Sequence, residues 1–164
     1  MKTNKSSFVI GIDVGTTSIK GMLLNGAGEI VAFAKQEYLL ETGDGGICEL
    51  DAEMYWSITC QIIRQLVSES NVDREDIAGV AFSGQGETLI VVDSDGKPMR
   101  KAIVWNDTRS DVEADEIKER FGSQQVMNMS GQPEIVAMWP ATRILWLKKH
   151  EPDIFARASK YLLV

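Results

Sequence analysis

The chain has 164 residues, of which 44% are hydrophobic and 25% charged, and its formal net charge at pH 7 is −7. These values are ordinary for a globular protein, and no cluster of basic residues indicates a nucleic-acid partner. No stretch of sequence approaches the roughly 20 apolar residues of a membrane span, so no membrane association is expected.

The N-terminal segment and the two cysteines favour a cytoplasmic protein. Asp13 interrupts the first apolar run, residues 8–14, and such an interruption is not typical of a signal peptide. Cys48 and Cys60 form no Cys-x-x-Cys pair and belong to no histidine cluster. We therefore expect both to be reduced cysteines in the core.

Apolar runs separated by turn residues predict three strands and a helix in the first part of the chain. The three strands are residues 8–14, 18–25 and 30–40. The first two form a hairpin with Gly15 in its turn, and residues 41–46 read as a loop. Asp51 is placed to cap a helix over 52–69. The apolar residues of this helix share one face at helical spacing: Tyr55, Ile58, Ile62 and Leu66.

More strands and a helix follow in the middle of the chain. The strand-like segments are residues 77–84, residues 87–98 with a turn at their end, and residues 102–107. Ser110 and Glu113 have the spacing of a capping box, and Gly122 is a natural C-cap, so these residues predict a helix over 110–121.

The last part of the chain predicts two helices and a strand. Residues 138–150 read as a helix with Pro140 in its first turn, and residues 151–158 read as a short one. Residues 160–164 read as a strand, and a domain seldom stops inside one, so we expect the chain to be part of a longer protein. The predicted fold class is α/β, with a mixed central sheet and flanking helices.

The segment Gly11–Gly21 carries the clearest chemical signal. Asp13 ends an apolar strand, and its carboxylate suits a hydrated Mg²⁺ that bridges phosphates. Residues that could bind phosphate oxygens follow within seven positions: Gly15, Thr16, Thr17, Ser18 and Lys20. Main-chain N–H groups of a tight turn, hydroxyl groups and a cation are all donors to anionic oxygens.

Other interpretations of the segment remain open. The Gly-Thr-Thr-Ser sequence could form only a hairpin, with Asp13 capping its own turn. The sequence contains no GxxxxGK[ST] motif, and its two Gly-x-Gly matches lead into strands rather than helices. Neither a P-loop nor a dinucleotide-binding fold is therefore expected.

Four segments together resemble the FGGY family of carbohydrate kinases. The first contains Asp13 and the phosphate-binding candidates, which match the family's Asp-x-Gly-Thr-Thr-Ser pattern and basic residue. The others are residues 83–88 (SGQGET), 102–109 (AIVWNDTR) and 139–155 (WPATRILWLKKHEPDIF). The first motif also occurs across the wider superfamily of actin-like ATPases, so the other three make the resemblance specific.

The resemblance implies an actin-like (ribonuclease H-like) fold and transfer of the γ-phosphoryl group of ATP to a sugar or polyol hydroxyl, with Mg²⁺. It implies that residues 1–164 are part of an N-terminal domain that binds sugar and phosphate, and that a second domain is absent from this chain. The family's catalytic base, an aspartate, and its adenine pocket are then expected beyond Val164.

The resemblance also suggests substrate-binding residues, each with a structural alternative. They are Gln85, Gly86, Glu87, Trp105, Asp107 and Arg109. Gln85 and Glu87 could grip vicinal hydroxyls or be solvated turn residues, and Trp105 could stack on a sugar or pack in the core. Asp107 and Arg109 could contact the sugar or form an ion pair behind the site. The other tryptophans are expected in the core: Trp56, Trp139 and Trp146.

The substrate is the least determined part of this interpretation. Xylulokinases typically carry Gln-Met-His at the turn, and glycerol kinases carry Gln-Arg-Glu-Thr, whereas this chain has Gln85, Gly86 and Glu87. Glycerol kinases also place a tyrosine where this chain has Met138. We rank a ketopentose such as xylulose first, and glycerol, another polyol or a sugar acid second.

Two hypotheses from other classes remain. An actin-like chaperone ATPase would share only the opening motif, and a sugar-binding regulator would have lost catalysis. The expected partner is a small-molecule sugar or polyol, and the sequence leaves open whether the chain forms a homo-oligomer.

Overall fold

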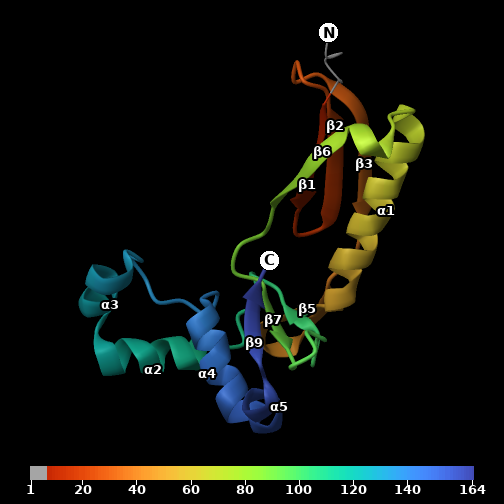
Figure 1. Cartoon of the computed structure of the whole chain (residues 1–164). Coiled ribbons are helices and arrows are strands. Elements are labelled where there is room, and N and C mark those ends of the chain that lie inside the picture. The colour runs from red at the N-terminus through yellow and green to blue at the C-terminus, as the bar shows by residue number, and fades with distance from the viewer. Residues whose placement is uncertain (1–6) are drawn as a thin grey trace. The chain divides into compact units, whose positions relative to one another are not determined.

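The structure is a computed structural model that describes residues 7–164. Residues 1–6, the start of the segment considered above as a signal peptide, lie outside the described residues. The chain divides into two compact units. The first combines the residues up to Leu39 with residues 53–85, and the second combines residues 40–52 with residues 86–164. Figure 1 labels most of the helices and strands of both units.

A four-stranded mixed sheet forms the first unit, in the order β3-β2-β1-β6. Its strands are β1 (Phe8–Val14), β2 (Ser18–Leu24), β3 (Ile30–Glu37) and β6 (Ile77–Ser83). β1 pairs antiparallel with β2 and parallel with β6. A parallel neighbour needs a crossover connection, and α1 (Ala52–Ser70), followed by a short 3-10 helix (Arg74–Asp76), lies between β3 and β6 in the chain.

Helix α1 covers one face of this sheet (Figure 1). All four residues predicted for its apolar face are buried, which confirms the helical periodicity. Gly21 of β2 lies directly beneath the helix, because an added Cβ would stand 2.4 Å from Cγ2 of Ile62 and 2.9 Å from Cδ1 of Leu66. The close approach of helix and sheet therefore depends on a residue without a side chain at this position.

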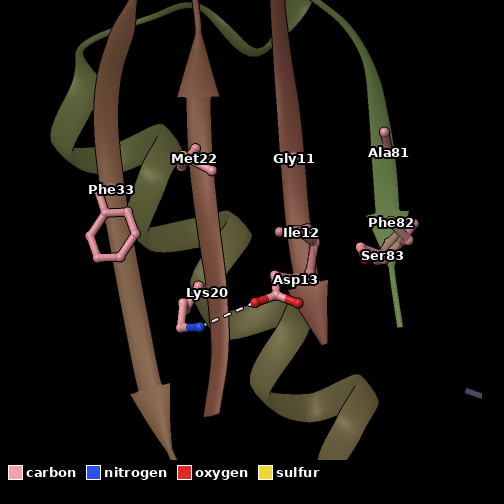
Figure 2. A pocket seen from close by; sticks show the side chains of 9 residues that line it. All are labelled: Gly11, Ile12, Asp13, Lys20, Met22, Phe33, Ala81, Phe82 and Ser83. Carbon is pink, nitrogen blue, oxygen red and sulfur yellow. Dashed lines mark hydrogen bonds and ion pairs between the residues drawn. The ribbon is translucent and has the colours of Figure 1, made fainter. Parts of the chain in front are cut away.

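The opposite face of the sheet carries a different set of side chains. Because successive residues of a strand point to opposite faces, Gly11 and Asp13 of β1 lie there beside Lys20 and Met22 of β2 (Figure 2). Phe33 of β3 is paired with Met22 and is half exposed. This face holds the acid and the cation singled out from the sequence.

An antiparallel five-stranded sheet forms the centre of the second unit, in the order β4-β5-β8-β7-β9. The strands are β4 (Glu41–Gly43), β5 (Ile47–Leu50), β7 (Leu89–Val92), β8 (Ala102–Ile103) and β9 (Lys160–Leu163), with a 3-10 turn (Asp44–Gly46) between β4 and β5. The helices are α2 (Asp111–Phe121), α3 (Ser123–Ser130), α4 (Pro140–His150) and α5 (Pro152–Arg157). Leu147 of α4 packs in a core cluster with residues of β7 and β8.

Most predicted elements are confirmed, and several details are corrected. Residues 41–43 form strand β4 rather than a loop, since they pair with β5. The helix at 111–121 exists and Gly122 ends it, but Ser110 makes no side-chain cap. The hydroxyl of Ser110 is buried and donates instead to the carbonyl of Ala137. Helix α3 was not predicted, because its eight residues include only three apolar ones.

Two predictions about the core also need correction. Trp56 is 64% exposed, although it lies on the helix that covers the sheet. Its neighbours at helical spacing fill the interface, and Trp56 lies on the solvent side of α1. Cys48 is buried, but Cys60 is only partly buried; both are free cysteines, as expected. Within residues 7–164, no helix is long and apolar enough to cross a membrane.

Candidate functional site

The predicted phosphate turn joins β1 and β2. The strand register pairs Asp13 with Lys20 and Val14 with Ile19, so the turn between them is tight. The N–H of Gly15 donates to the carbonyl of Ser18 at 3.1 Å. An added Cβ at Gly15 would stand 3.0 Å from that same carbonyl oxygen, which explains the glycine.

The carboxylate of Asp13 and the ammonium of Lys20 form an ion pair across the two strands. Oδ2 of Asp13 lies 3.2 Å from Nζ of Lys20, and both side chains are about half exposed (Figure 2). They stand at the polar end of a cavity of about 320 Å³, whose remaining lining is mostly apolar. The predicted metal ligand and the predicted phosphate cation are therefore neighbours within reach of solvent.

The three hydroxyl residues of the turn differ in exposure. Thr17 is exposed and Thr16 is half-buried, whereas Ser18 is buried. Ser18 contributes its main-chain carbonyl to the turn, and the carbonyl of Thr17 accepts from the N–H of Tyr38. The threonine side chains are thus better placed than Ser18 to meet a ligand.

Two side-chain donors bind the carbonyl of Gly15 in this turn. The hydroxyl of Tyr38 donates to it, and Nε2 of Gln85 donates to it at 3.1 Å. The same Nε2 lies 3.3 Å from the hydroxyls of both Tyr38 and Tyr55. Burial raises the pKa of Tyr38, and neighbouring Tyr55 adds to the effect, so Tyr38 stays a neutral donor.

Sequence reasoning placed Gln85 with the substrate residues and did not single out either tyrosine. Tyr55 was read only as part of an apolar helix face, and Tyr38 only as part of a strand-like run. Nothing in their spacing indicates that Tyr38 and Gln85 meet at the carbonyl of Gly15, or that Tyr55 contacts Gln85. Such a convergence follows from the tertiary arrangement of the unit.

The second group of candidate residues lies where β7 and β8 leave their ladder. Leu89 pairs with Ile103, and because the strands are antiparallel, Glu87 and Trp105 depart from the same end of the pair. Thr88 is fully buried, and its Oγ1 accepts from the N–H of Trp105 at 3.0 Å. Gly86 has a φ of +78°, a conformation that favours glycine at this point of the turn.

A cavity of about 300 Å³ opens beside Glu87. The other lining residues come from the segment before α4 and end at the N-cap of that helix: Gln132, Pro133, Glu134, Val136, Met138 and Trp139. Trp139, expected in the core, is half-buried and borders this cavity. Trp105, which is not one of the residues lining this cavity, is 37% exposed. The arrangement offers a carboxylate and apolar surfaces to a polyhydroxylated molecule.

Asp107 and Arg109 form a buried ionic network. Asp107 is fully buried, and its Oδ2 accepts from the N–H of Cys48 at 2.6 Å and from Nη2 of Arg109 at 2.7 Å. Arg109 also pairs with Glu49 at 2.7 Å, and its guanidinium lies 5.0 Å from the ring centre of Trp146. These contacts favour the ion-pair interpretation of Asp107 and Arg109 over direct contact with a sugar.

Comparison with known proteins agrees with these features. Residues 8–164 match the sequence model of the N-terminal domain of the FGGY family of carbohydrate kinases. The chain is 32% identical over 157 residues to the xylulose kinase of Staphylococcus xylosus, covering 96% of this chain and 32% of that protein. It is 32% identical over 156 residues to the glycerol kinase of Janthinobacterium sp. (strain Marseille), covering 94% and 31%.

A solved structure shows the same fold. The gluconate kinase from Lactobacillus acidophilus superposes with a TM-score of 0.87 and 30% sequence identity, over 96% of this chain and 31% of that one. This agreement confirms the predicted fold class. The chain spans about a third of the length of the relatives that it matches.

Proposed function

Because the chain belongs to the FGGY family of carbohydrate kinases, we propose that it serves in transfer of the γ-phosphoryl group of ATP to a hydroxyl of a sugar or polyol. The observation that carries this proposal is the pairing of Asp13 with Lys20 at the mouth of the Gly-Thr-Thr-Ser turn. Phosphoryl transfer depends on positioning and charge neutralisation, and this turn concentrates groups for both.

The residues around Asp13 fit a magnesium ion that accompanies ATP. Mg²⁺ keeps several water ligands and takes one or two protein carboxylates together with phosphate oxygens. Within residues 7–164 no group of three or more acidic, histidine or cysteine side chains forms a cage. A single half-exposed carboxylate is what such a hydrated ion requires, and the bound ion would neutralise phosphate charge.

The phosphate groups are assigned to the turn and its cation. Thr16 and Thr17 supply hydroxyl donors, Gly15 permits the tight turn, and Lys20 supplies a positive charge that Asp13 holds in place. Tyr38 and Gln85 keep the Gly15 carbonyl fixed, and therefore help to fix the turn. The expected binding strength comes from several charge-assisted hydrogen bonds rather than one.

The sugar is assigned to the cavity beside Glu87. The carboxylate of Glu87 can accept hydrogen bonds from two hydroxyl groups, and the accessible ring of Trp105 suits the C–H face of a sugar. Asp107 and Arg109 support this region from behind through their buried ion pair.

We rank a ketopentose such as xylulose first among acceptors, because relatives named xylulose kinase match the chain at 30–34% identity. A relative named glycerol kinase matches at 32%, and a structure named gluconate kinase at 30%. Glycerol, another polyol and a sugar acid are therefore the alternative acceptors.

The test is an assay of ADP release by the full-length protein with ATP and Mg²⁺ against ketoses, aldoses, polyols and sugar acids. We expect ADP release that depends on the acceptor, with the highest kcat/KM for a ketopentose. If none of the acceptors changes the rate of ADP release from its value without acceptor, the proposal is contradicted. A higher kcat/KM for glycerol or gluconate than for any ketopentose would support the kinase activity but assign it a different substrate.

A further inference from the structure

Arg143 is a fully buried arginine in the first turn of α4. Its guanidinium donates only to main-chain carbonyls: Nη1 to Glu87 at 2.5 Å, and Nη2 to Trp105 at 2.5 Å and to Asp107 at 3.4 Å. Asp107 directs its carboxylate to Arg109 instead. Among residues 7–164, Arg143 has no carboxylate within ion-pair distance.

Such a cation is costly to keep. A charge removed from water without a paired anion loses its hydration, and its Nε also lacks a hydrogen-bond partner among the described residues. Burial lowers the pKa of Arg143, and the charges of Asp107 and Glu87 oppose this effect. An apolar side chain of similar length would avoid this cost. The contacts of the guanidinium must therefore explain why an arginine is present at this position.

The three acceptors belong to the two segments proposed to hold the sugar. The β7–β8 ladder ends at Leu89 and Ile103, and beyond it Arg143 joins the carbonyl of Glu87 to that of Trp105. The planar guanidinium presents donors in a fixed fork, which an ammonium group does not. One side chain therefore fixes the spacing of two backbone segments.

The main chain of Trp105 is held at both its N–H and its carbonyl. Thr88 accepts from its N–H, and Arg143 donates to its carbonyl. The side chain of Glu87 lines the cavity of about 300 Å³, and its backbone is held by the same guanidinium. The orientation of the acid and of the indole ring toward a ligand is thereby tied to Arg143.

We propose that Arg143 is a positioning residue for sugar binding, which sets the placement of Glu87 and Trp105 through their carbonyl groups without touching the substrate. This inference rests on the proposed function for the identity of the ligand. The joining of the two segments by Arg143 can be tested without any substrate.

The experiment compares four forms of the full-length protein: wild type, Arg143→Met, Arg143→Lys and Leu147→Ala. Leu147→Ala is the matched control, because Leu147 is equally buried on α4 but packs in the apolar core. Steady-state KM values for acceptor and ATP are measured together with Tm. Amide hydrogen exchange is followed in peptides that cover residues 83–89 and 102–109.

We expect Arg143→Met to raise KM for the acceptor by about tenfold or more, since charged hydrogen bonds that orient the site are lost. KM for ATP should stay within about twofold, and exchange should accelerate in both segments. Arg143→Lys should recover part of the loss, because it restores the charge but not the fork. Leu147→Ala should lower Tm and leave KM for the acceptor within about twofold.

Two outcomes would overturn the proposal. Equal changes of acceptor KM in Arg143→Met and Leu147→Ala, at similar loss of Tm, would mean that Arg143 only stabilises the unit. Unchanged hydrogen exchange in both segments of Arg143→Met would mean that it does not hold them, and this result needs no activity. Absence of acceptor-dependent turnover in the wild type would instead count against the proposed function.

Discussion

Asp13 is proposed to act on the phosphate groups and not on the acceptor. Asp13→Asn in the full-length protein should lower kcat by about 100-fold or more, because stabilisation of charge at the phosphates is lost. KM for the acceptor should change little, since Asp13 lies at the end of β1, beside the turn to which we assign the phosphate groups. Steady-state kinetics at saturating Mg²⁺ checks this.

Asp115→Asn is the control for this substitution. Asp115 also pairs with a lysine, at 2.9 Å, but lies exposed on α2. It should leave kcat unchanged. Turnover of Asp13→Asn close to that of the control would remove Asp13 from the metal role.

Glu87 should act on the acceptor. Glu87→Ala is expected to raise KM for the sugar by about 10- to 100-fold, because a charged hydrogen bond contributes roughly 1.5–3 kcal/mol. KM for ATP should change less. The KM of Glu87→Gln for the sugar should fall between those of the wild type and Glu87→Ala. Equal increases of both KM values would assign Glu87 a structural role.

At the residue scale, the sequence indicates which residues carry chemical groups of interest better than it indicates which residues contact one another. The Asp13–Lys20 pair follows from a hairpin that the sequence predicts, because the register places them opposite each other. The burial of Asp107 could not be predicted, since the same Asp-x-Arg spacing suits either contact with a ligand or an ion pair. Arg143 was not singled out at all, because an arginine in an apolar helix gives no sign that it binds carbonyl groups.

At the scale of elements, Gly21 is the critical contact between α1 and the mixed sheet. Gly21→Ala should lower stability by about 1–3 kcal/mol, because the new methyl group would overlap Ile62 and Leu66. Gly79→Ala in β6 is the control, since its Cβ would meet no atom within 4 Å. Thermal unfolding should show a lower Tm for Gly21→Ala alone. Equal Tm values for the two variants would show that the helix can move away from β2.

Helices and strands with long repeating patterns of apolar residues can be predicted from the sequence better than short ones. Helix α1 was predicted to within one residue at its end, because four apolar residues repeat over its length. The strand predicted over 102–107 is reduced to the two residues of β8, and the eight-residue helix α3 has too few residues to establish a period. Ser110 had the spacing of a cap, but its hydroxyl bonds to Ala137, a residue 27 positions away. Long-range contacts of this kind are not encoded in local spacing.

At the scale of the whole molecule, residues 1–164 alone are expected to show no kinase activity above background. We propose, from the family resemblance, that the catalytic aspartate lies beyond Val164, and loss of a general base typically costs about 10²- to 10⁴-fold. Strand β9 is at the edge of its sheet, with Leu162 and Leu163 exposed, so the isolated chain should also self-associate.

ADP release and mass in solution, measured for this chain beside its full-length parent, check both expectations. Turnover within tenfold of the parent would show that residues 1–164 contain a complete active site. A monomeric mass at high concentration would show that the edge of β9 is protected.

Phosphorus NMR of the full-length protein with ATP, Mg²⁺ and a ketopentose such as xylulose tests the proposed transfer of phosphate to a sugar or polyol most directly. We predict that the γ-phosphate signal of ATP decreases while the signal of a sugar phosphate ester grows by the same amount. Growth of inorganic phosphate in place of the ester would indicate an ATPase, as expected of a chaperone. Unchanged ATP with xylulose, glycerol and gluconate alike would contradict the kinase function.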